Sequence, residues 1–224
     1  MIDQGHISLQ MIEQLIKATL FIFLFSCAQV IADDLILVRI ETNLGTIEVQ
    51  LDAKKAPLSS GNFLKHVDAA HYNNMIFHRV IEGFVVQSGG YKENLEEMES
   101  EDTLFNEADN GLHNIKGSIA MAREDEIDSA GRQFFINTED NQRLDYSEKS
   151  CTREDEQKYL KAIERGLNKP LTCASFGYAV FGHVVSGMAV VRQIESSPTE
   201  DRGDFYDLPV TPITITSITR VIPN

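Results

Sequence analysis

The chain has 224 residues, of which 34 are acidic and 20 are basic, so its formal net charge is −14. This charge repels phosphate groups, which excludes nucleic acid as an expected partner and disfavours binding to anionic lipid. Hydrophobic residues make up 42% of the chain and charged residues 24%, as in an ordinary globular protein, and the length fits one domain with a leader, or at most two small domains.

Residues 18–32 form an apolar run that follows Lys17 and precedes two aspartates. A charged start, a short apolar centre and small residues near its end are typical of a secretory signal peptide, so we expect residues 1–32 to be removed. The run is too short and too interrupted for a comfortable membrane span. Two alternatives stay open, an uncleaved anchor and a lipoprotein signal in which Cys27 carries the lipid. The mature domain is then predicted to span residues 33–224.

The first half of this domain has the period-two pattern of half-buried strands. Residues 35–52 alternate apolar and polar positions around a glycine-containing turn, which predicts a hairpin. Pro57 opens a helical stretch with apolar residues at three-to-four spacing. Strands are predicted at residues 75–81 and 83–89, followed by a long polar surface loop over residues 91–114.

The second half contains further strand-like segments at residues 117–124, 131–138 and 177–187, and a helix that starts at Met188. The final segment, residues 212–221, is a strand whose apolar phase slips between two isoleucines, which suggests a bulge. Many strands at close spacing, without an alternating strand–helix rhythm, predict a mainly antiparallel sheet. We expect it to close into a barrel or a sandwich capped by helices.

The charged segment 146–175 lacks strand alternation and contains Cys151 and Cys173. In an exported chain that has lost its leader, two remaining cysteines usually pair, so we predict a disulfide between them. A capping-box pattern predicts a short helix over residues 153–165. Its evident apolar anchors are Tyr159, Leu160 and Ile163. The segment is predicted to be a disulfide-closed helical insertion in a loop.

The usual catalytic signatures are missing from the sequence: it has no GxSxG, no HExxH and no phosphate-binding loop. The six histidines show no paired metal spacing, so we predict neither a metal nor a cofactor. Two polar residues stand out in the apolar segment FHRVIEGFVVQSGG, residues 77–90. Arg79 and Gln87 each interrupt an apolar run, although a buried guanidinium is costly without partners. Alternation predicts Arg79 and His78 on opposite faces of the strand.

The segments FHRVIEGFVVQSGG, GSIAMARE, GRQFFIN, RLD and FGYAVFG occur in this order and resemble the cyclophilin family of peptidyl-prolyl cis-trans isomerases. Together with the export signal, the chain is similar to bacterial periplasmic cyclophilins. The resemblance implies a closed eight-stranded antiparallel barrel capped by two helices, with a groove on its outer face. It also implies a periplasmic enzyme that accelerates rotation about X–Pro bonds in exported proteins without a cofactor.

The resemblance assigns site residues position by position. Arg79 matches the catalytic arginine of the family, and Gln87 matches a glutamine that would orient it or bind the substrate backbone. Phe135 matches the floor of a proline pocket. The other positions implied in substrate binding are Phe84, Val85, Ala122, Arg123, Gln133, Arg143, Leu144 and Tyr178.

Four of these positions depart from residues common in the family. Val85 falls where many relatives have methionine. Tyr178 falls where many members carry histidine, and Arg123 falls where asparagine is frequent. Arg143 falls where cyclosporin-sensitive members carry tryptophan, so we expect this chain to bind cyclosporin weakly.

Two functions fit this reading. One is an active prolyl isomerase that assists the folding of exported proteins, and the other is a module that binds proline-containing segments with weak catalysis. The intact Arg79, Phe84, Gln87 and Phe135 favour the enzyme. The expected partners are proline-containing unfolded or flexible polypeptides, and the mature chain is expected to be a monomer without a stable membrane partner.

Overall fold

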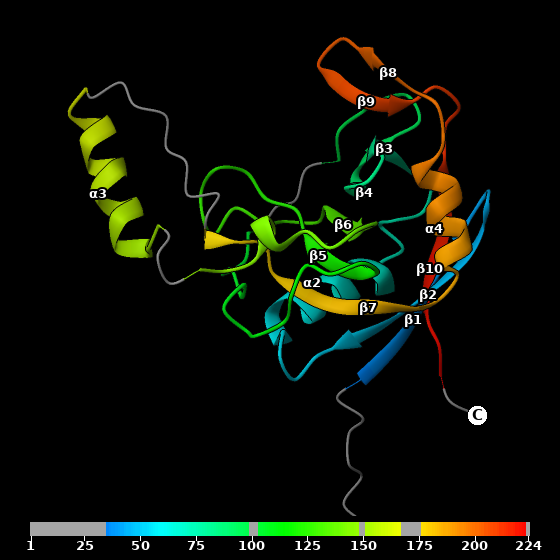
Figure 1. Cartoon of the computed structure of the whole chain (residues 1–224), viewed down its shortest axis with the longest axis horizontal. Helices are drawn as coiled ribbons and strands as arrows, with labels where there is room; N and C mark the ends of the chain where they lie inside the picture. The colour runs from blue at the N-terminus through cyan, green and yellow to red at the C-terminus, as the bar shows by residue number, and fades with distance from the viewer. Residues whose placement is uncertain (1–34, 99–102, 148–150, 167–175, 223–224) are drawn as a thin grey trace, which may run out of the picture. The chain divides into compact units, whose positions relative to one another are not determined.

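A computed structural model describes residues 35–98, 103–147, 151–166 and 176–222. Eight strands form a closed antiparallel barrel in the order β1-β10-β3-β4-β6-β5-β7-β2, and pairing of β1 with β2 closes the ring (Figure 1). This confirms the predicted mainly β fold. The predicted signal peptide lies outside the described residues.

The elements lie close to the predicted positions. The barrel strands are β1 (Leu35–Thr42), β2 (Gly45–Asp52), β3 (Met75–Ile81), β4 (Val85–Lys92), β5 (Ser118–Met121), β6 (Phe134–Asn137), β7 (Val180–Ser186) and β10 (Thr214–Arg220). The helices are α2 (Pro57–Asp68), α3 (Arg153–Glu164) and α4 (Met188–Glu195), with a short 3₁₀ turn, η1, at Gln142–Leu144. Within the described ranges, no helix has the length and apolar character needed to cross a membrane.

The small sheet of β8 (Thr199–Arg202) and β9 (Phe205–Pro209) was not predicted. All four residues of β8 are exposed, so this strand has no apolar alternation from which it could be recognised.

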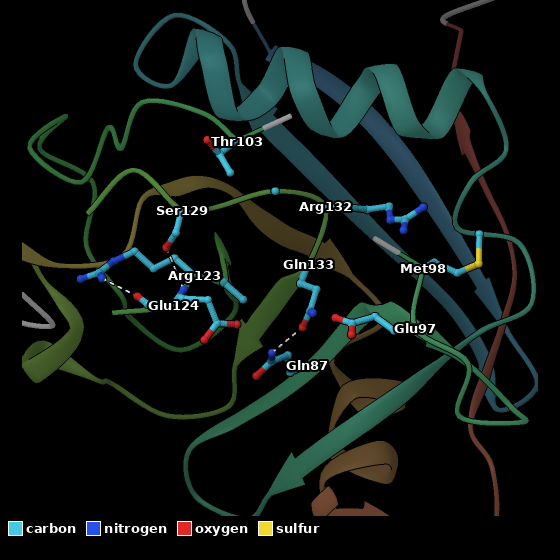
Figure 2. Close-up of a pocket in the computed structure, with 11 residues that line it drawn as sticks. Gln87, Glu97, Met98, Thr103, Arg123, Glu124, Ser129, Arg132 and Gln133 are labelled. Atoms are coloured by element: carbon cyan, nitrogen blue, oxygen red, sulfur yellow. Dashed lines mark hydrogen bonds between the residues drawn. The ribbon is translucent and has the colours of Figure 1, made fainter. Parts of the chain in front are cut away.

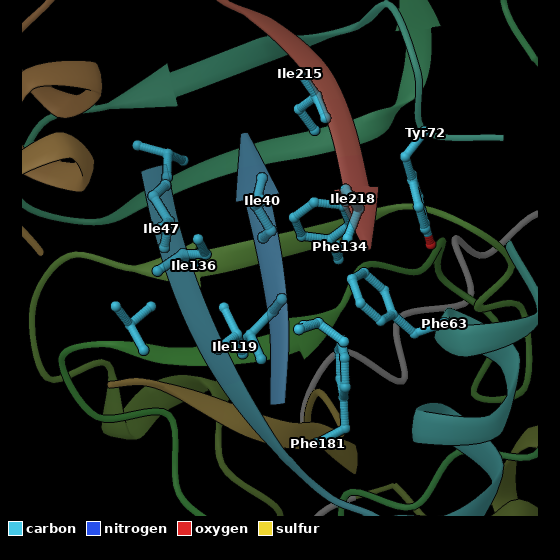
Figure 3. Close-up of a cluster of buried hydrophobic side chains, with 14 of the residues drawn as sticks. Ile40, Ile47, Phe63, Tyr72, Ile119, Phe134, Ile136, Phe181, Ile215 and Ile218 are labelled. Atoms are coloured by element: carbon cyan, nitrogen blue, oxygen red, sulfur yellow. The ribbon is translucent and has the colours of Figure 1, made fainter. Parts of the chain in front are cut away.

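The barrel encloses one large hydrophobic core (Figure 3). Phe63 reaches into it from α2 and packs against Tyr72, Phe134 and Phe181, with ring centroids 5.1 to 5.4 Å apart. From α4, Val191 and Ile194 are also fully buried. Both helices therefore cap the barrel through their apolar faces, as their spacing predicts.

The predicted bulge in the last strand is confirmed. Ser217 pairs with Glu41 and Ile215 pairs with Thr42, which leaves Thr216 as the extra residue of β10. An extra residue shifts the alternation by one position. Ile215 and Ile218, although three apart in sequence, therefore both face the core.

A second bulge, in β3, modifies the predicted alternation around Arg79. Phe77 pairs with Ser88 and Arg79 pairs with Gln87, so His78 is an extra residue without a partner of its own in β4. Phe77 and Val80 both pack in the core as a result. The simple prediction that Arg79 and His78 alternate across the strand therefore fails, and the bulge is what brings Arg79 beside Gln87.

The prediction that residues 91–114 form a surface loop is wrong in part. Asn106, Glu107, Ala108 and Asn114 are buried. The carboxylate of Glu107 accepts hydrogen bonds from the Leu58 and Ser59 amides at 2.9 and 2.7 Å, in the first turn of α2. The first turn of α2 has no acidic residue of its own, so Glu107 satisfies amides that the helix leaves unpaired.

The predicted capping box of α3 is confirmed, because the side chains and amides of Thr152 and Asp155 bond reciprocally. Its predicted anchors are wrong in part. Tyr159 and Ile163 are exposed, whereas Leu160 packs against a small apolar cluster and Glu156 is the buried residue of the helix. Cys173 lies outside the described residues, so its disulfide with Cys151 stays a prediction.

Candidate active site

Strand alternation divides the apolar residues of the barrel between the core and its outer face. In β6, Phe134 and Ile136 belong to the core, whereas Phe135 belongs to a separate cluster. Val85 from β4 and Ala120 from β5 join Phe135 in this cluster. Because successive side chains of a strand point to opposite faces, the second cluster forms an apolar surface outside the barrel.

The register of the strands aligns the predicted catalytic residues with this surface. Arg79 pairs with Gln87, Gln87 with Phe135, and Phe135 with Ala120. Neighbouring strands are about 4.8 Å apart, so these four residues form one row across β3, β4, β6 and β5. The row places a guanidinium, an amide and an aromatic ring side by side.

A cavity of about 190 Å³ lies over this row. Its lining consists of Arg79, Phe84, Val85, Gln87, Ala122, Arg123, Phe135, Leu144 and Tyr178. The structure therefore brings together every predicted site residue except Gln133 and Arg143. Phe135 is 4% exposed and meets the ring of Tyr178 edge-on, with centroids 5.7 Å apart, which gives the cavity an aromatic base.

Gln133 and Arg143 lie next to this cavity. The Gln133 side chain accepts a hydrogen bond from the side-chain amide of Gln87. The guanidinium of Arg143 stacks over the ring of Phe84, 4.3 Å from its centroid. Arg143 therefore covers the outer side of a ring that lines the cavity.

A chain of two amides ends at Arg79. The Nε2 of Gln87 donates to Oε1 of Gln133 at 2.9 Å (Figure 2). This leaves Oε1 of Gln87 to accept from Nη1 of Arg79 at 3.4 Å. Gly90 makes room for this arrangement, because a Cβ there would lie 2.6 Å from the amide group of Gln133. The prediction that Gln87 orients Arg79 is consistent with this geometry.

The guanidinium of Arg79 bonds to a neutral partner, whereas several other described arginines pair with a carboxylate. Arg39, Arg153 and Arg220 each pair with a carboxylate. The half-buried Arg79 has a neutral amide oxygen instead, and no described carboxylate lies within ion-pair distance of it. A cation that lines a cavity, with no described counter-charge beside it, is able to donate hydrogen bonds to a ligand.

Buried amides fix the loops around the cavity, and sequence reasoning missed them. Asn141 donates to the carbonyl of Phe84 at 2.9 Å and to Oδ1 of Asn137 at 2.8 Å. Asn137 in turn donates to Oδ1 of Asn114 at 3.1 Å, and Asn114 donates to the carbonyl of Leu144 at 3.0 Å. Asn114 and Asn141 lie in loops and look like ordinary turn residues in the sequence, which gives no signal that they are buried.

Burial lowers the pKa of two groups beside the row. Burial lowers the pKa of His78 to about 4, so its ring is neutral at pH 7 where it packs edge-on against Tyr91, 4.7 Å between centroids. Burial also lowers the pKa of Arg123, whose guanidinium lies 4.8 Å from the centroid of the Tyr178 ring.

A second cavity, of about 250 Å³, adjoins the first, and Gln87, Ala122 and Arg123 line both (Figure 2). The sequence did not predict most of its lining, which comes largely from loops. These residues are Glu97, Met98, Thr103, Glu124, Ser129, Gly131 and Arg132. Together the two cavities form a continuous groove on the outer face of the barrel.

Comparison with known proteins agrees with this site. Residues 37–220 match the family model described as cyclophilin type peptidyl-prolyl cis-trans isomerase/CLD. The chain is 42% identical over 180 residues to peptidyl-prolyl cis-trans isomerase A of Dickeya dadantii, covering 80% of this chain and 82% of that protein. It is 37% identical over 183 residues to peptidyl-prolyl cis-trans isomerase B of Escherichia coli, covering 82% and 98%.

A solved structure has the same fold. The crystal structure of a Cryptosporidium parvum cyclophilin type isomerase aligns with a TM-score of 0.61 at 21% identity, covering 85% of this chain and 99% of that one. The chain therefore belongs to the cyclophilin-type peptidyl-prolyl cis-trans isomerase family, and it is a peptidyl-prolyl isomerase.

Proposed function

We propose that this isomerase accelerates rotation about X–Pro bonds in exported polypeptides, and that Arg79 is its catalytic residue. The observation that carries the proposal is the position of the Arg79 guanidinium at the edge of a cavity whose base is Phe135. The expected partners are unfolded or flexible polypeptides that contain proline. A Cryptosporidium parvum cyclophilin with this fold was crystallised in the presence of the dipeptide Ala-Pro, which supports a ligand of this class.

The chemistry follows from the electronic structure of the peptide bond. Rotation about the C–N bond has a barrier of ~18–20 kcal/mol, because resonance gives this bond partial double-bond character. As the bond twists, resonance is lost and the prolyl nitrogen becomes a better hydrogen-bond acceptor. A donor that bonds this nitrogen only in the twisted state lowers the barrier by differential binding of the transition state.

Different residues of the groove suit the binding of the proline ring and the donation of a hydrogen bond to its nitrogen. The apolar surface around Phe135 holds the proline ring and excludes water from one side of the bond. The amide chain from Gln133 through Gln87 fixes the direction of the Arg79 donor before the substrate arrives. These residues act by positioning and by hydrogen bonding, so the step requires neither a nucleophile nor a proton transfer.

The proposed location is the periplasm, reached through the predicted signal peptide at residues 1–32. Support comes from the sequence alone, namely the apolar run behind Lys17. The test is intact mass and N-terminal sequencing of the protein recovered from the periplasmic fraction. We expect a chain that begins at Asp33, whereas a full-length or lipid-modified chain in the membrane fraction would contradict the proposal.

The test of the activity is a refolding reaction limited by proline isomerisation, followed with and without the mature protein. Uncatalysed isomerisation takes about 10–100 s at 25 °C, so acceleration is easily measured. We expect catalytic amounts of the protein to shorten this phase. A module that only binds proline-containing segments would act at stoichiometric amounts and would slow the phase or leave its rate unchanged.

A further inference from the structure

One side of the groove is a loop, residues 123–129, which we call the wall loop. Arg123, Glu124 and Ser129 line the second cavity, and Arg123 also lines the cavity over Phe135 (Figure 2). The wall loop follows directly on Ala122, which lines both cavities. The position of this loop therefore sets the shape of the groove beside the proposed proline pocket.

The wall loop is organised around the side chain of Arg123. Its Nη1 donates to the carbonyl oxygens of residues 124, 125 and 126 at 2.8, 3.4 and 3.4 Å. Ser129 donates to the carbonyl of Glu126 and accepts from the amide of Glu124. Residues 124–126 are exposed, and Ile127 is the fully buried side chain of the loop. The loop therefore needs support from outside itself to hold a fixed place.

Glu156 of α3 provides one such support. Its side chain is buried, and Oε1 accepts a hydrogen bond from the amide of Ile127 at 2.6 Å. The negative charge of Glu156 also interacts with Arg123. A buried carboxylate is costly unless it has hydrogen bonds and an opposite charge nearby, and Glu156 has both in the wall loop.

Arg153, one turn earlier in α3, provides a second support. Its Nε and Nη2 donate to the two carboxylate oxygens of Asp128 at 3.2 and 3.0 Å, and Nη2 also donates to the carbonyl of Asn106 at 2.9 Å. The guanidinium lies over the rings of Phe105 and Phe176, 3.5 and 4.6 Å from their centroids. A bidentate, stacked arginine fixes orientation better than a flexible ion pair.

Apolar contacts complete the attachment. Ile127 forms a small buried cluster with Ala108 and Phe176, and Leu160 and Cys151 pack against it. Helix α3 therefore contacts two consecutive residues of the wall loop, Ile127 through a hydrogen bond and packing, and Asp128 through an ion pair.

We propose that α3 braces the wall loop, and that Glu156 and Arg153 are positioning residues of the substrate groove. They hold the wall loop in place and, through it, the side chain of Arg123 where a bound peptide lies. This assigns a role to the insertion at residues 146–175 without giving it a catalytic group. The inference rests on the proposed function, because it concerns the binding of proline peptides in the same groove.

The expected effect is on binding rather than on the chemical step. Arg79 and Gln87 lie on β3 and β4, whereas the bonds of α3 reach Ile127, Asp128 and Asn106. Loss of the brace should therefore raise KM and leave kcat nearly unchanged. Residues that act through a network change affinity by about two- to thirtyfold, which is the range we expect here.

The experiment compares Glu156→Ala and Glu156→Gln with wild type in a proline-peptide isomerisation assay, and follows hydrogen exchange of residues 123–129. We expect Glu156→Ala to raise KM about two- to thirtyfold and to speed exchange of the Ile127 amide. Glu156→Gln keeps an acceptor oxygen, so its KM and its exchange rate should lie between those of wild type and those of Glu156→Ala. Glu154→Ala is the matched control, because Glu154 is an exposed carboxylate on the same helix that pairs with Lys158.

The outcomes separate the possibilities. If Glu156→Ala speeds exchange in the wall loop but keeps the wild-type KM, the brace has no part in substrate binding and the inference is overturned. A fall in kcat at unchanged KM also overturns it. If Glu156→Ala does not fold, Asp128→Asn and Glu156→Gln carry the same test. Failure of the wild-type protein to catalyse isomerisation would instead contradict the proposed function.

Discussion

Replacing Arg79 with alanine tests the proposed catalytic residue while sparing the fold. The side chain of Arg79 is half-buried, and its one described hydrogen bond, to Gln87, is long at 3.4 Å. A weak hydrogen bond of this kind contributes about 1 kcal/mol or less to the free energy of unfolding. The Arg79→Ala variant should therefore fold, with urea unfolding close to that of wild type.

The loss of activity should be far larger than the loss of stability. The guanidinium lines the cavity over Phe135 and has no described carboxylate to neutralise it, so its donors are available to the twisted substrate. Removing one preorganised donor to a transition state commonly costs ~2.7–4 kcal/mol, or 10²–10³ in rate. We expect kcat/KM to fall by that factor, mainly through kcat, because the bond forms in the transition state.

The assay is isomerisation of a short X–Pro peptide at low temperature, where the uncatalysed reaction takes minutes. Arg39→Ala is the matched control. Arg39 also lies on a barrel strand, but its Nε and Nη2 both donate to Oε1 of Glu48 on β2, and it lines neither cavity. Its removal should change activity by less than about twofold, because an exposed ion pair contributes little. An Arg79→Ala enzyme with wild-type turnover would refute the reasoning.

Three further predictions concern other parts of the chain. Burial lowers the pKa of His78 from 6.5 to about 4, so the free energy of unfolding should be highest above pH 6.5 and fall by about 3 kcal/mol as the pH drops towards 4. Urea unfolding at several pH values should show this fall in wild type and a smaller one in His78→Phe. The same pH dependence in both proteins would contradict the prediction. Cyclosporin should bind weakly to wild type and more tightly to Arg143→Trp, which restores a large apolar ring and an N–H donor; equal affinities in a titration would exclude this. Cys151 and Cys173 should form a disulfide worth ~3 kcal/mol in the chain-entropy model; two thiols alkylated without prior reduction, seen by intact mass, would rule it out.

The sequence was most informative about the site where polar residues interrupt an apolar segment with a strand pattern. The run from Phe77 to Gly90 predicted two strands, and the polar residues within it, Arg79 and Gln87, line the groove. The predicted Phe135 likewise lies outside the core although both its neighbours lie within it. The resemblance to the cyclophilin family identified these positions, because a phenylalanine in an apolar strand reads by itself as a core residue.

Other parts of the site depend on partners that are remote in sequence. Glu107 bonds to Ser59 across 48 positions, and Glu156 bonds to Ile127 across 29. Both carboxylates belong to acidic segments that read as solvated surface, since composition does not reveal which member of such a segment turns inward. The bulge at His78 is similar, because it arises from the pairing of β3 with β4 and leaves no local signal.

The closed ring of strands has a consequence for how this enzyme meets its clients. Each of the eight barrel strands has a hydrogen-bonded neighbour on both sides. Unfolded polypeptides aggregate by adding to exposed strand edges, and an enzyme with an open edge would recruit them in that way. The barrel offers no such template, and among the described strands the unpaired edges belong to the small β8–β9 sheet. Under the proposed function, a client is therefore held in the groove through its proline and nearby side chains rather than along a barrel strand.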